Sequence, residues 1–140
     1  MSGLLGVLLA SGGGFVVSLS GETVSDIQSS PATATATITI KSTGIVEKTE
    51  NVTTTQIDSP DWVSPTSLAG GAFEVQATVN SGAVSAGTTG SWLALSSDRS
   101  WTCTSSIVGT ATANLTLAIR HNGGATLASN TYVLEAQVIP

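Results

Sequence analysis

The feature that most constrains the fold is a ten-residue run, 110–119, in which apolar and small polar side chains alternate. Its sequence is Thr-Ala-Thr-Ala-Asn-Leu-Thr-Leu-Ala-Ile. Successive side chains of a β-strand point to opposite faces, so this period of two predicts a strand with one buried and one solvated face. The same alternation recurs at residues 34–40 and 73–79. The chain is therefore predicted to be built from half-buried strands.

Turn residues divide the rest of the chain into further predicted strands. The expected strands are residues 15–20, 32–41, 45–54, 72–80, 91–96, 99–104, 110–120 and 131–139. Residues 23–31 are expected to be a polar connection, and 91–104 a hairpin that turns at Ser97-Asp98. The segment 57–65 contains two prolines and is predicted to be a loop anchored by Trp62.

Seven to nine strands with no convincing amphipathic helix predict an all-β fold, an antiparallel β-sandwich. An immunoglobulin-like (Ig-like) Greek key is the closest architecture, although the paired cysteines of antibody domains are missing. A small barrel or a jelly roll would have a similar strand count and stays an alternative. The length of 140 residues fits one sandwich domain, 15–140, preceded by an arm, 1–14.

The first 14 residues do not fit a sandwich strand and predict an apolar arm on a glycine hinge, Gly12-Gly13-Gly14. The side chains expected to dock are Leu4, Leu5, Val7, Leu8 and Leu9. A signal peptide is the alternative, but no Lys or Arg precedes the apolar run, which is barely long enough. The run is too short to span a bilayer, so no membrane span is expected. We expect the arm to be buried against its own domain or a neighbouring subunit.

The charge balance restricts the class of partner. The net charge is −5, and the basic residues are Lys41, Lys48, Arg99 and Arg120. A chain with so few basic side chains is not expected to bind nucleic acid. Only 9% of residues are charged, and Ser and Thr outnumber them. A sparse ionic surface of this kind favours a chain packed against neighbours, with a homo-oligomer expected.

No group of residues predicts an enzyme or a cofactor site. His121 is the only histidine, and beside the Asn122-Gly123 turn it is expected to be a solvated surface residue. Cys103 is the only cysteine and is expected to point inward with Trp101. One histidine and one cysteine are too few for a zinc site.

Carboxylates and tryptophans leave two weaker alternatives. A calcium site would need loops to bring together Asp26, Asp58, Asp61 and Asp98. Paired catalytic carboxylates could come only from different strands, and these residues are interpreted as solubilising charges: Glu47, Glu50, Glu74 and Glu135. A sugar-stacking platform would use Trp62, Trp92 and Trp101, which are more often core fillers and loop anchors.

Three segments carry a resemblance to a known group of proteins. Residues 88–101 read Thr-Thr-Gly-Ser-Trp-Leu-Ala-Leu-Ser-Ser-Asp-Arg-Ser-Trp, residues 61–65 read Asp-Trp-Val-Ser-Pro, and a Thr-rich strand ends Ala118-Ile119-Arg120. Over residues 32–138 the chain resembles small β-rich structural proteins of tailed-bacteriophage and prophage virions. The shared motifs are packing and turn motifs, so they indicate lineage better than activity.

The resemblance implies a non-enzymatic virion component, a tail, tail-tip or baseplate protein, with other virion structural proteins as partners. Assembly would take place in the bacterial cytoplasm, and the final location would be the virion. A capsid decoration protein is the first alternative. The second is a module that binds a host-surface glycan or receptor through its tryptophans.

Overall fold

The computed structural model describes residues 17–58 and 73–140, which form nine strands and no helix. The strands are β1 Glu22–Ser29, β2 Ala34–Ile40, β3 Val46–Glu50, β4 Thr53–Asp58, β5 Phe73–Gly82, β6 Trp92–Ala94, β7 Arg99–Ser105, β8 Gly109–His121 and β9 Thr126–Ile139. The predicted all-β class is confirmed.

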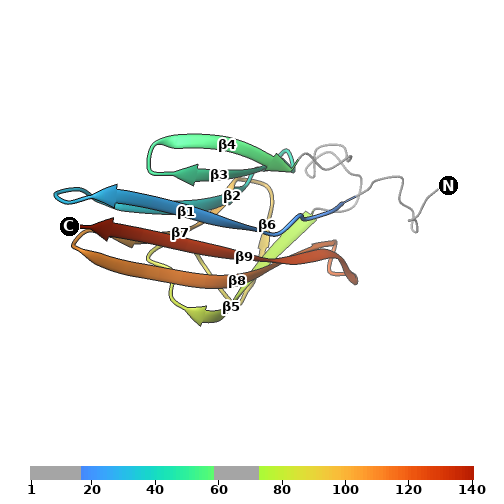
Figure 1. The fold of residues 1–140 in the computed structure, drawn as a ribbon. Helices are drawn as coiled ribbons and strands as arrows, with labels where there is room; N and C mark the ends of the chain where they lie inside the picture. The colour runs from blue at the N-terminus through green and yellow to red at the C-terminus, as the bar shows by residue number, and fades with distance from the viewer. Residues whose placement is uncertain (1–16, 59–72) are drawn as a thin grey trace.

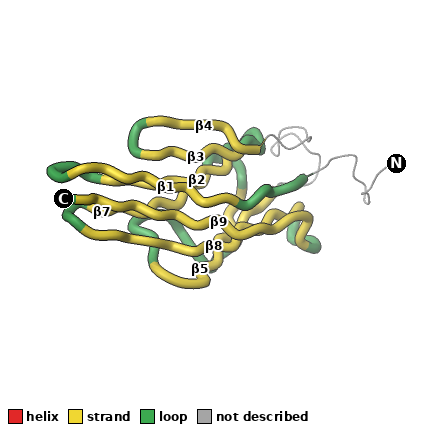
Figure 2. The backbone as a smooth tube through the Cα atoms, in the orientation of Figure 1, coloured by secondary structure: helices red, strands yellow, loops and turns green. Residues whose placement is uncertain are grey.

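The strands form two sheets that pack face to face as a β-sandwich (Figures 1 and 2). One sheet has the order β1-β9-β8-β5-β6 and the other the order β4-β3-β2-β7. All neighbours are antiparallel except β1 and β9, which run parallel. The pair β2–β7 and the trio β5–β8–β9 have the arrangement of the B–E and C–F–G strands in Ig-like sandwiches.

The alternating runs supply the core, as predicted. In β8, Ala113, Leu115, Leu117 and Ile119 are fully buried, while Thr112 is exposed on the other face. The largest fully buried side chains are Trp101 of β7 and Tyr132 of β9. Because burying one Leu, Ile or Phe side chain stabilises the fold by about 1.5–3 kcal/mol, these inward faces hold the two sheets together.

The first strand lies later in the chain than expected. Residues 17–21 are not a strand, and β1 occupies the segment predicted to be a polar connection. Only Val24 and Asp26 of β1 are buried, so no apolar alternation marks the strand. Asp26 is tolerated in the interior because its carboxylate accepts hydrogen bonds from Thr35 N, at 2.8 Å, and Gln28 Nε2, at 2.7 Å.

The predicted strand 45–54 is two strands, β3 and β4. The chain reverses at Asn51, which has a φ of 61°, a conformation that asparagine tolerates better than most residues. The charged side chains of β3 concealed this turn, because they gave no apolar period whose interruption would mark it.

The predicted hairpin at residues 91–104 is also wrong. β6 pairs with β5, whereas β7 pairs with β2 in the other sheet. The connection therefore crosses between the sheets, and Leu95, which follows β6, is fully buried between them. Short spacing predicted the hairpin, but the pairing of β6 with β5 and of β7 with β2 places the two strands in different sheets.

The two ends of the described chain lie at opposite ends of the sandwich (Figure 1). Residues 17–21 lie beside the first half of β9, because Glu22 pairs with Tyr132 and Asn130 contacts Leu19 and Ser20, and the chain ends beyond Ile139 at the other end. The predicted arm residues Leu4, Leu5, Val7, Leu8 and Leu9, and the predicted anchor Trp62, lie outside the described residues.

Candidate functional site

The segment that leads from the predicted arm into β1 is fastened to the sandwich, and we call residues 17–21 the arm root. Leu19 is 6% exposed and belongs to the core. Asn130 Nδ2 donates to the carbonyl oxygens of Leu19, at 2.8 Å, and Ser20, at 2.9 Å. Asp58 Oδ2 accepts hydrogen bonds from Ser20 N and Ser20 Oγ, both at 3.1 Å. The root is thus held by β9 on one side and by the end of β4 on the other.

Gly21 fits the arm root for two reasons. Its φ is +71°, which side chains rarely adopt. A Cβ at this position would lie 2.5 Å from Asn130 Oδ1 and 2.9 Å from the carbonyl oxygen of Thr131. Asn130 Oδ1 is itself fixed, because it accepts a hydrogen bond from Thr131 N at 2.8 Å. Glycine therefore lets the chain pass close to β9.

Tyr132 links the arm root to the core. Its ring is fully buried, and its hydroxyl donates to Asp58 Oδ2 at 3.3 Å. Burial raises the pKa of Tyr132 to about 12, so the phenol stays neutral and remains a donor near neutral pH. The Asp58 carboxylate therefore accepts hydrogen bonds from both the arm root and β9.

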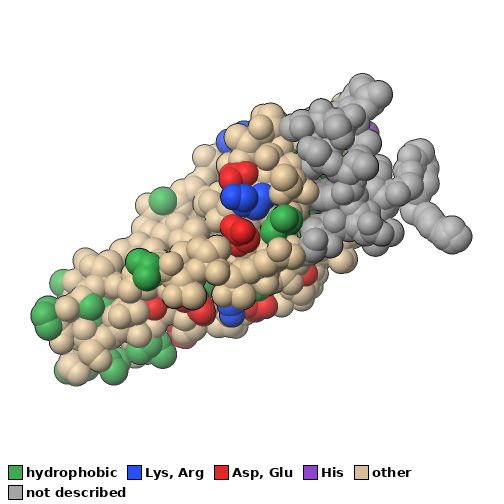
Figure 3. Space-filling model, turned by 90° about the horizontal axis from the view of Figure 1, so that it is seen from above, with side chains coloured by type: hydrophobic (Ala, Val, Ile, Leu, Met, Phe, Trp, Pro, Cys, Tyr) green, Lys and Arg blue, Asp and Glu red, His purple; other side chains and the backbone are tan. Residues whose placement is uncertain are grey.

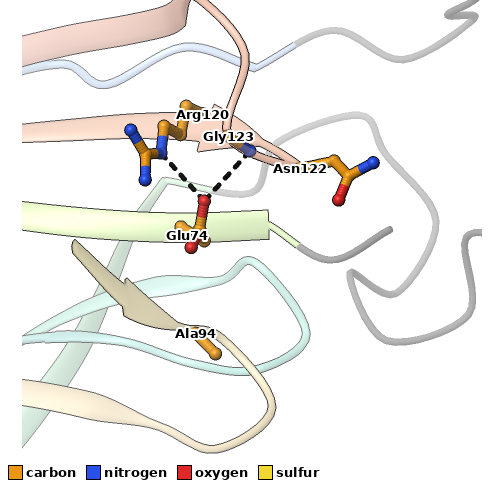
Figure 4. Close-up of a pocket in the computed structure, with 5 residues that line it drawn as sticks. All are labelled: Glu74, Ala94, Arg120, Asn122 and Gly123. Atoms are coloured by element: carbon orange, nitrogen blue, oxygen red, sulfur yellow. Dashed lines mark hydrogen bonds and ion pairs between the residues drawn. The ribbon is translucent and has the colours of Figure 1, made fainter. Parts of the chain in front are cut away.

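A shallow surface pocket of about 290 Å³ lies near the same end of the sandwich, lined by Glu74, Ala94, Arg120, Asn122 and Gly123 (Figure 4). Glu74 Oε1 pairs with Arg120 Nε at 2.8 Å and accepts a hydrogen bond from Gly123 N at 3.1 Å. The Arg120 guanidinium carbon lies 4.1 Å from the centroid of the Trp92 ring. The pocket charges are thus already engaged within the chain.

The structure separates the predicted tryptophans. Trp101 is fully buried, and its Nε1 donates to the carbonyl oxygen of Thr88 at 2.6 Å, so it is a core anchor. Trp92 is half-buried on the other sheet and has Arg120 against its ring. Trp92 and Trp101 therefore do not form a shared stacking platform, and Trp62 lies outside the described residues.

The structure agrees with the prediction for Cys103 and disagrees with the prediction for His121. Cys103 is buried beside Trp101 as predicted, its thiol donates to the carbonyl oxygen of Ala83 at 3.4 Å, and burial raises its pKa. His121 was expected to be a solvated residue, but it is half-buried, with its ring centroid 5.1 Å from that of Phe73. Strand β8 extends through His121, and this extension brings the imidazole against the first residue of β5.

Of the four acidic residues considered for a calcium site, Asp61 lies outside the described residues and the other three do not gather. Asp26, Asp58 and Asp98 each accept hydrogen bonds at separate places, Asp98 from Ser42 N at 2.9 Å. Asp98 also pairs with Lys41, and these two contacts, the Ser42 amide first, lower its pKa. Across residues 17–58 and 73–140, no three His, Cys, Asp or Glu side chains are placed to hold a metal ion. In the same ranges, no helix has the length and hydropathy to cross a membrane.

Two of the four glutamates interpreted as solubilising charges meet at β1. Ser25 N donates to Glu50 Oε2 at 3.0 Å, and Ser25 Oγ donates to Glu135 Oε1 at 3.4 Å. Lys48 Nζ lies 3.0 Å from Glu22 Oε2 and 3.9 Å from Glu50 Oε1, which balances the charge. The cluster caps one backbone amide of β1 and links β1 to β3 and β9, a structural role that the sequence pattern did not indicate.

Outside these clusters the surface carries few charges (Figure 3). The view shows small groups of opposite charge on a face made mostly of other polar side chains and backbone. Exposed large apolar side chains occur toward the end of β9, namely Ile27, Ile107, Val108 and Ile139. Apolar side chains gathered in this way are typical of contact surfaces rather than of solvated ones.

The residues of the arm root were not predicted individually. Gly21, Asp58 and Asn130 meet only in the fold, because Asn130 lies 111 positions from Leu19 in the chain. The one local signal was Gly21 after an apolar stretch.

Comparison of the chain with protein-family models, with curated proteins and with solved structures found no match.

Proposed function

We propose that this chain is a non-enzymatic structural component of a multi-subunit assembly, and that its N-terminal arm docks on a neighbouring subunit. The observation that carries the proposal is the arm root, which leaves the sandwich from one fixed point between β4 and β9. A root fastened by a buried leucine and several hydrogen bonds gives the preceding arm a fixed point of attachment. Such preorganisation reduces the entropy lost on docking.

The composition of the arm supports the same role. Residues 1–21 contain no charged side chain, and five Leu and Val side chains lie within residues 4–9. Each such side chain that becomes fully buried contributes about 1.5–3 kcal/mol. Full burial of all five in a neighbouring subunit would contribute about 7–15 kcal/mol, which is of the same order as the cost of ordering the backbone of residues 4–9 at about 1–2 kcal/mol per residue.

The surface of the sandwich supports packing among neighbours. Thr and Ser side chains cover the outer face of the four-stranded sheet, and charged side chains are sparse. Such a face can be covered by another protein without the large cost of desolvating ions. From the resemblance we propose that the assembly is a tailed-bacteriophage virion and that the chain belongs to the tail, tail tip or baseplate.

Deletion of residues 1–13 tests the arm. The arm root remains intact in this variant, so we expect the thermal unfolding midpoint of the domain to be unchanged and incorporation into particles to be lost. Immunoblots of purified particles measure incorporation. A matched control replaces Ser2 with Asn, which alters the arm without removing an apolar side chain. Normal incorporation of the truncated chain would refute the proposed docking.

Two alternatives are separated by further measurements. If the chain decorates a capsid, immunoblots of separated heads and tails will find it on the heads. If it binds a glycan or receptor, a glycan array will show binding that Trp62→Ala or Trp92→Ala abolishes. The burial of Trp101 and the Arg120 contact of Trp92 make the second alternative the weaker one.

A further inference from the structure

Three of the four sheet edges are either short or partly closed by hydrogen bonds within the chain. At the β1 edge, Glu50 accepts the hydrogen bond of Ser25 N. At the β7 edge, Ser85 N donates to the carbonyl oxygen of Thr102 at 2.7 Å, and Thr102 N donates to that of Ala86 at 3.0 Å. The β6 edge is only three residues long, and its Ala94 carbonyl oxygen accepts a hydrogen bond from Arg99 Nε at 2.9 Å. Closed or short edges of this kind prevent pairing with other chains.

The fourth edge, β4, is open. No described residue pairs with its outer side. Among the described residues, its contacts are the pairing with β3, the Thr49–Thr54 hydroxyl pair, the packing of Ile57 against the core and the hydrogen bonds of Asp58. Thr53, Thr54, Thr55 and Gln56 are exposed, and Asp58 at the end is the only charged residue of the strand. The strand contains no Lys or Pro, the residues that usually block an edge.

A row of threonines crosses the outer face of this sheet and ends on the open edge. Thr102 of β7 pairs with Thr37 of β2, Thr37 with Thr49 of β3, and Thr49 with Thr54 of β4. The hydroxyl oxygens of Thr37 and Thr102 lie 2.9 Å apart, as do those of Thr49 and Thr54. Cross-strand hydroxyl pairs therefore already join strands in this sheet, and Thr54 presents the same chemistry to a further strand.

We propose that β4 pairs in antiparallel fashion with β4 of a second copy of this chain, about a two-fold axis beside Thr54. The two four-stranded sheets then form one continuous sheet, and the threonine row runs through both copies. In an antiparallel pair, side chains directly opposite each other point to the same face of the sheet. The two-fold axis therefore places one residue of β4 opposite the same residue of the second copy. The threonine row selects Thr54 as that residue.

This register agrees with the charges and apolar side chains around the edge. It pairs Thr53, Thr54 and Thr55 with Thr55, Thr54 and Thr53 of the second copy. Asp58 extends beyond the second copy's turn at Asn51 and Val52, so the two Asp58 carboxylates do not face each other. Gln56 lies opposite Val52, which is 87% exposed and gains cover from the second copy. A charged or apolar partner strand would lack the hydroxyl match, so a second copy fits this edge best.

This contact rests on the proposed structural role, but its test needs only the purified full-length chain. Single cysteines are introduced as Thr54→Cys and, as the control, Thr112→Cys, an exposed threonine in the middle of the other sheet. Native Cys103 is 1% exposed and is present in both variants. We expect Thr54→Cys to form a disulfide-linked dimer under mild oxidation about ten-fold faster than Thr112→Cys, because opposed strand residues are within disulfide range. Equal rates would overturn the proposal.

Sedimentation equilibrium gives the second readout. The wild-type chain is expected to show twice the monomer mass of 14.0 kDa. Thr54→Lys sets two ammonium groups opposite each other and should raise the dimer dissociation constant about ten-fold or more, whereas Thr112→Lys should leave it unchanged. A wild-type chain that stays monomeric, or a dimer insensitive to Thr54→Lys, overturns the proposal. Association through the arm alone would leave Thr54→Cys cross-linking at the control rate, so failure here is distinct from failure of arm docking.

Discussion

Gly21 and Gly123 share a left-handed backbone conformation but differ in their surroundings. Their φ angles are +71° and +73°. A Cβ at Gly21 would collide with Asn130 and with the backbone of Thr131, whereas a Cβ at Gly123 would meet nothing within 4 Å. Alanine substitutions at Gly21 and Gly123 therefore separate the free-energy cost of the left-handed backbone conformation from the free-energy cost of close packing at the arm root.

We predict that Gly21→Ala destabilises the domain more than Gly123→Ala. The conformation alone should cost about 1 kcal/mol, the expected effect at Gly123. The collision at Gly21 should raise the cost to about 2–4 kcal/mol, since the backbone of β9 cannot move freely. Urea denaturation of both variants measures the difference. Equal losses of stability would show that the arm root is not tightly packed against β9.

Tyr132 predicts a pH dependence of stability at alkaline pH. Its pKa is raised from 10.0 to about 12 by burial, so the unfolded chain loses the phenolic proton first. The stabilisation of the neutral phenol is complete below pH 10 and is lost as the pH rises toward 12. The unfolding free energy should fall by about 2–3 kcal/mol across this window, at about 1.4 kcal/mol for each pKa unit.

The Tyr132→Phe variant isolates this effect from the other groups that titrate at high pH. The pKa values of Lys41, Lys48 and Cys103 are also raised, and these groups remain in both proteins. The variant should be less stable near neutral pH, because Asp58 loses a donor, but its stability should decline less above pH 10. Parallel alkaline profiles for the two proteins would contradict the assignment to Tyr132.

At the level of elements, the sequence predicts strands well where apolar residues alternate. β2, β5 and β8 contain the alternating runs 34–40, 73–79 and 110–119, and the second half of β9 alternates in the same way. β1 was missed because Asp26 occupies one of its inward positions and pairing with β9, not local pattern, makes it a strand. The crossing between β6 and β7 was missed because spacing alone does not distinguish a hairpin from a change of sheet.

The candidate site shows the same division. The apolar arm is a prediction that depends on residues 4–9 alone, whereas the edge at β4 was not predicted, because charged β3 hid the turn at Asn51. The contacts of the arm root join residues from the start, middle and end of the chain, such as Ser20, Asp58 and Asn130. A single sequence carries no signal for such distant pairs.

We predict that Glu50→Ala loosens the edge of β1. The Ser25 amide loses its acceptor at 3.0 Å, and Lys48 loses one of two carboxylate partners. The loss should cost about 1–2 kcal/mol, and hydrogen exchange at the Ser25 amide should rise about ten-fold or more.

Glu47→Ala is the matched control for this variant, because Glu47 lies on the same strand but faces away from β1. Exchange measured by NMR should be unchanged at Ser25 in the control. An unchanged Ser25 exchange rate in Glu50→Ala would mean that solvent or another group replaces the carboxylate.

At the scale of the whole molecule, ionic interactions contribute little to stability. The ion pairs of the described residues involve Lys41, Lys48 and Arg120, and all of them are partly exposed. The two sheets are held together by apolar side chains, and hydroxyl pairs join neighbouring strands within the four-stranded sheet.

We therefore predict that the unfolding free energy changes by less than about 1 kcal/mol between about 0.05 and 0.5 M NaCl, since exposed pairs of this kind are weak and easily screened. Chemical denaturation with urea at several salt concentrations checks this. A loss of several kcal/mol at high salt would show that the ion pairs, including Arg120 with Glu74, stabilise the fold far more than their exposure indicates.

The parallel pairing of β1 with β9 has a consequence for synthesis of the protein. Glu22 finds its partner Tyr132 only after almost the whole chain has been translated. At about 5–20 residues per second, β1 and the arm root leave the ribosome several seconds before the strand that fastens them. Asn130 and Tyr132, which fix the root, lie on that last strand. A nascent chain that stops early therefore cannot present its arm from a fixed root, so arm docking would select subunits translated to their last strand.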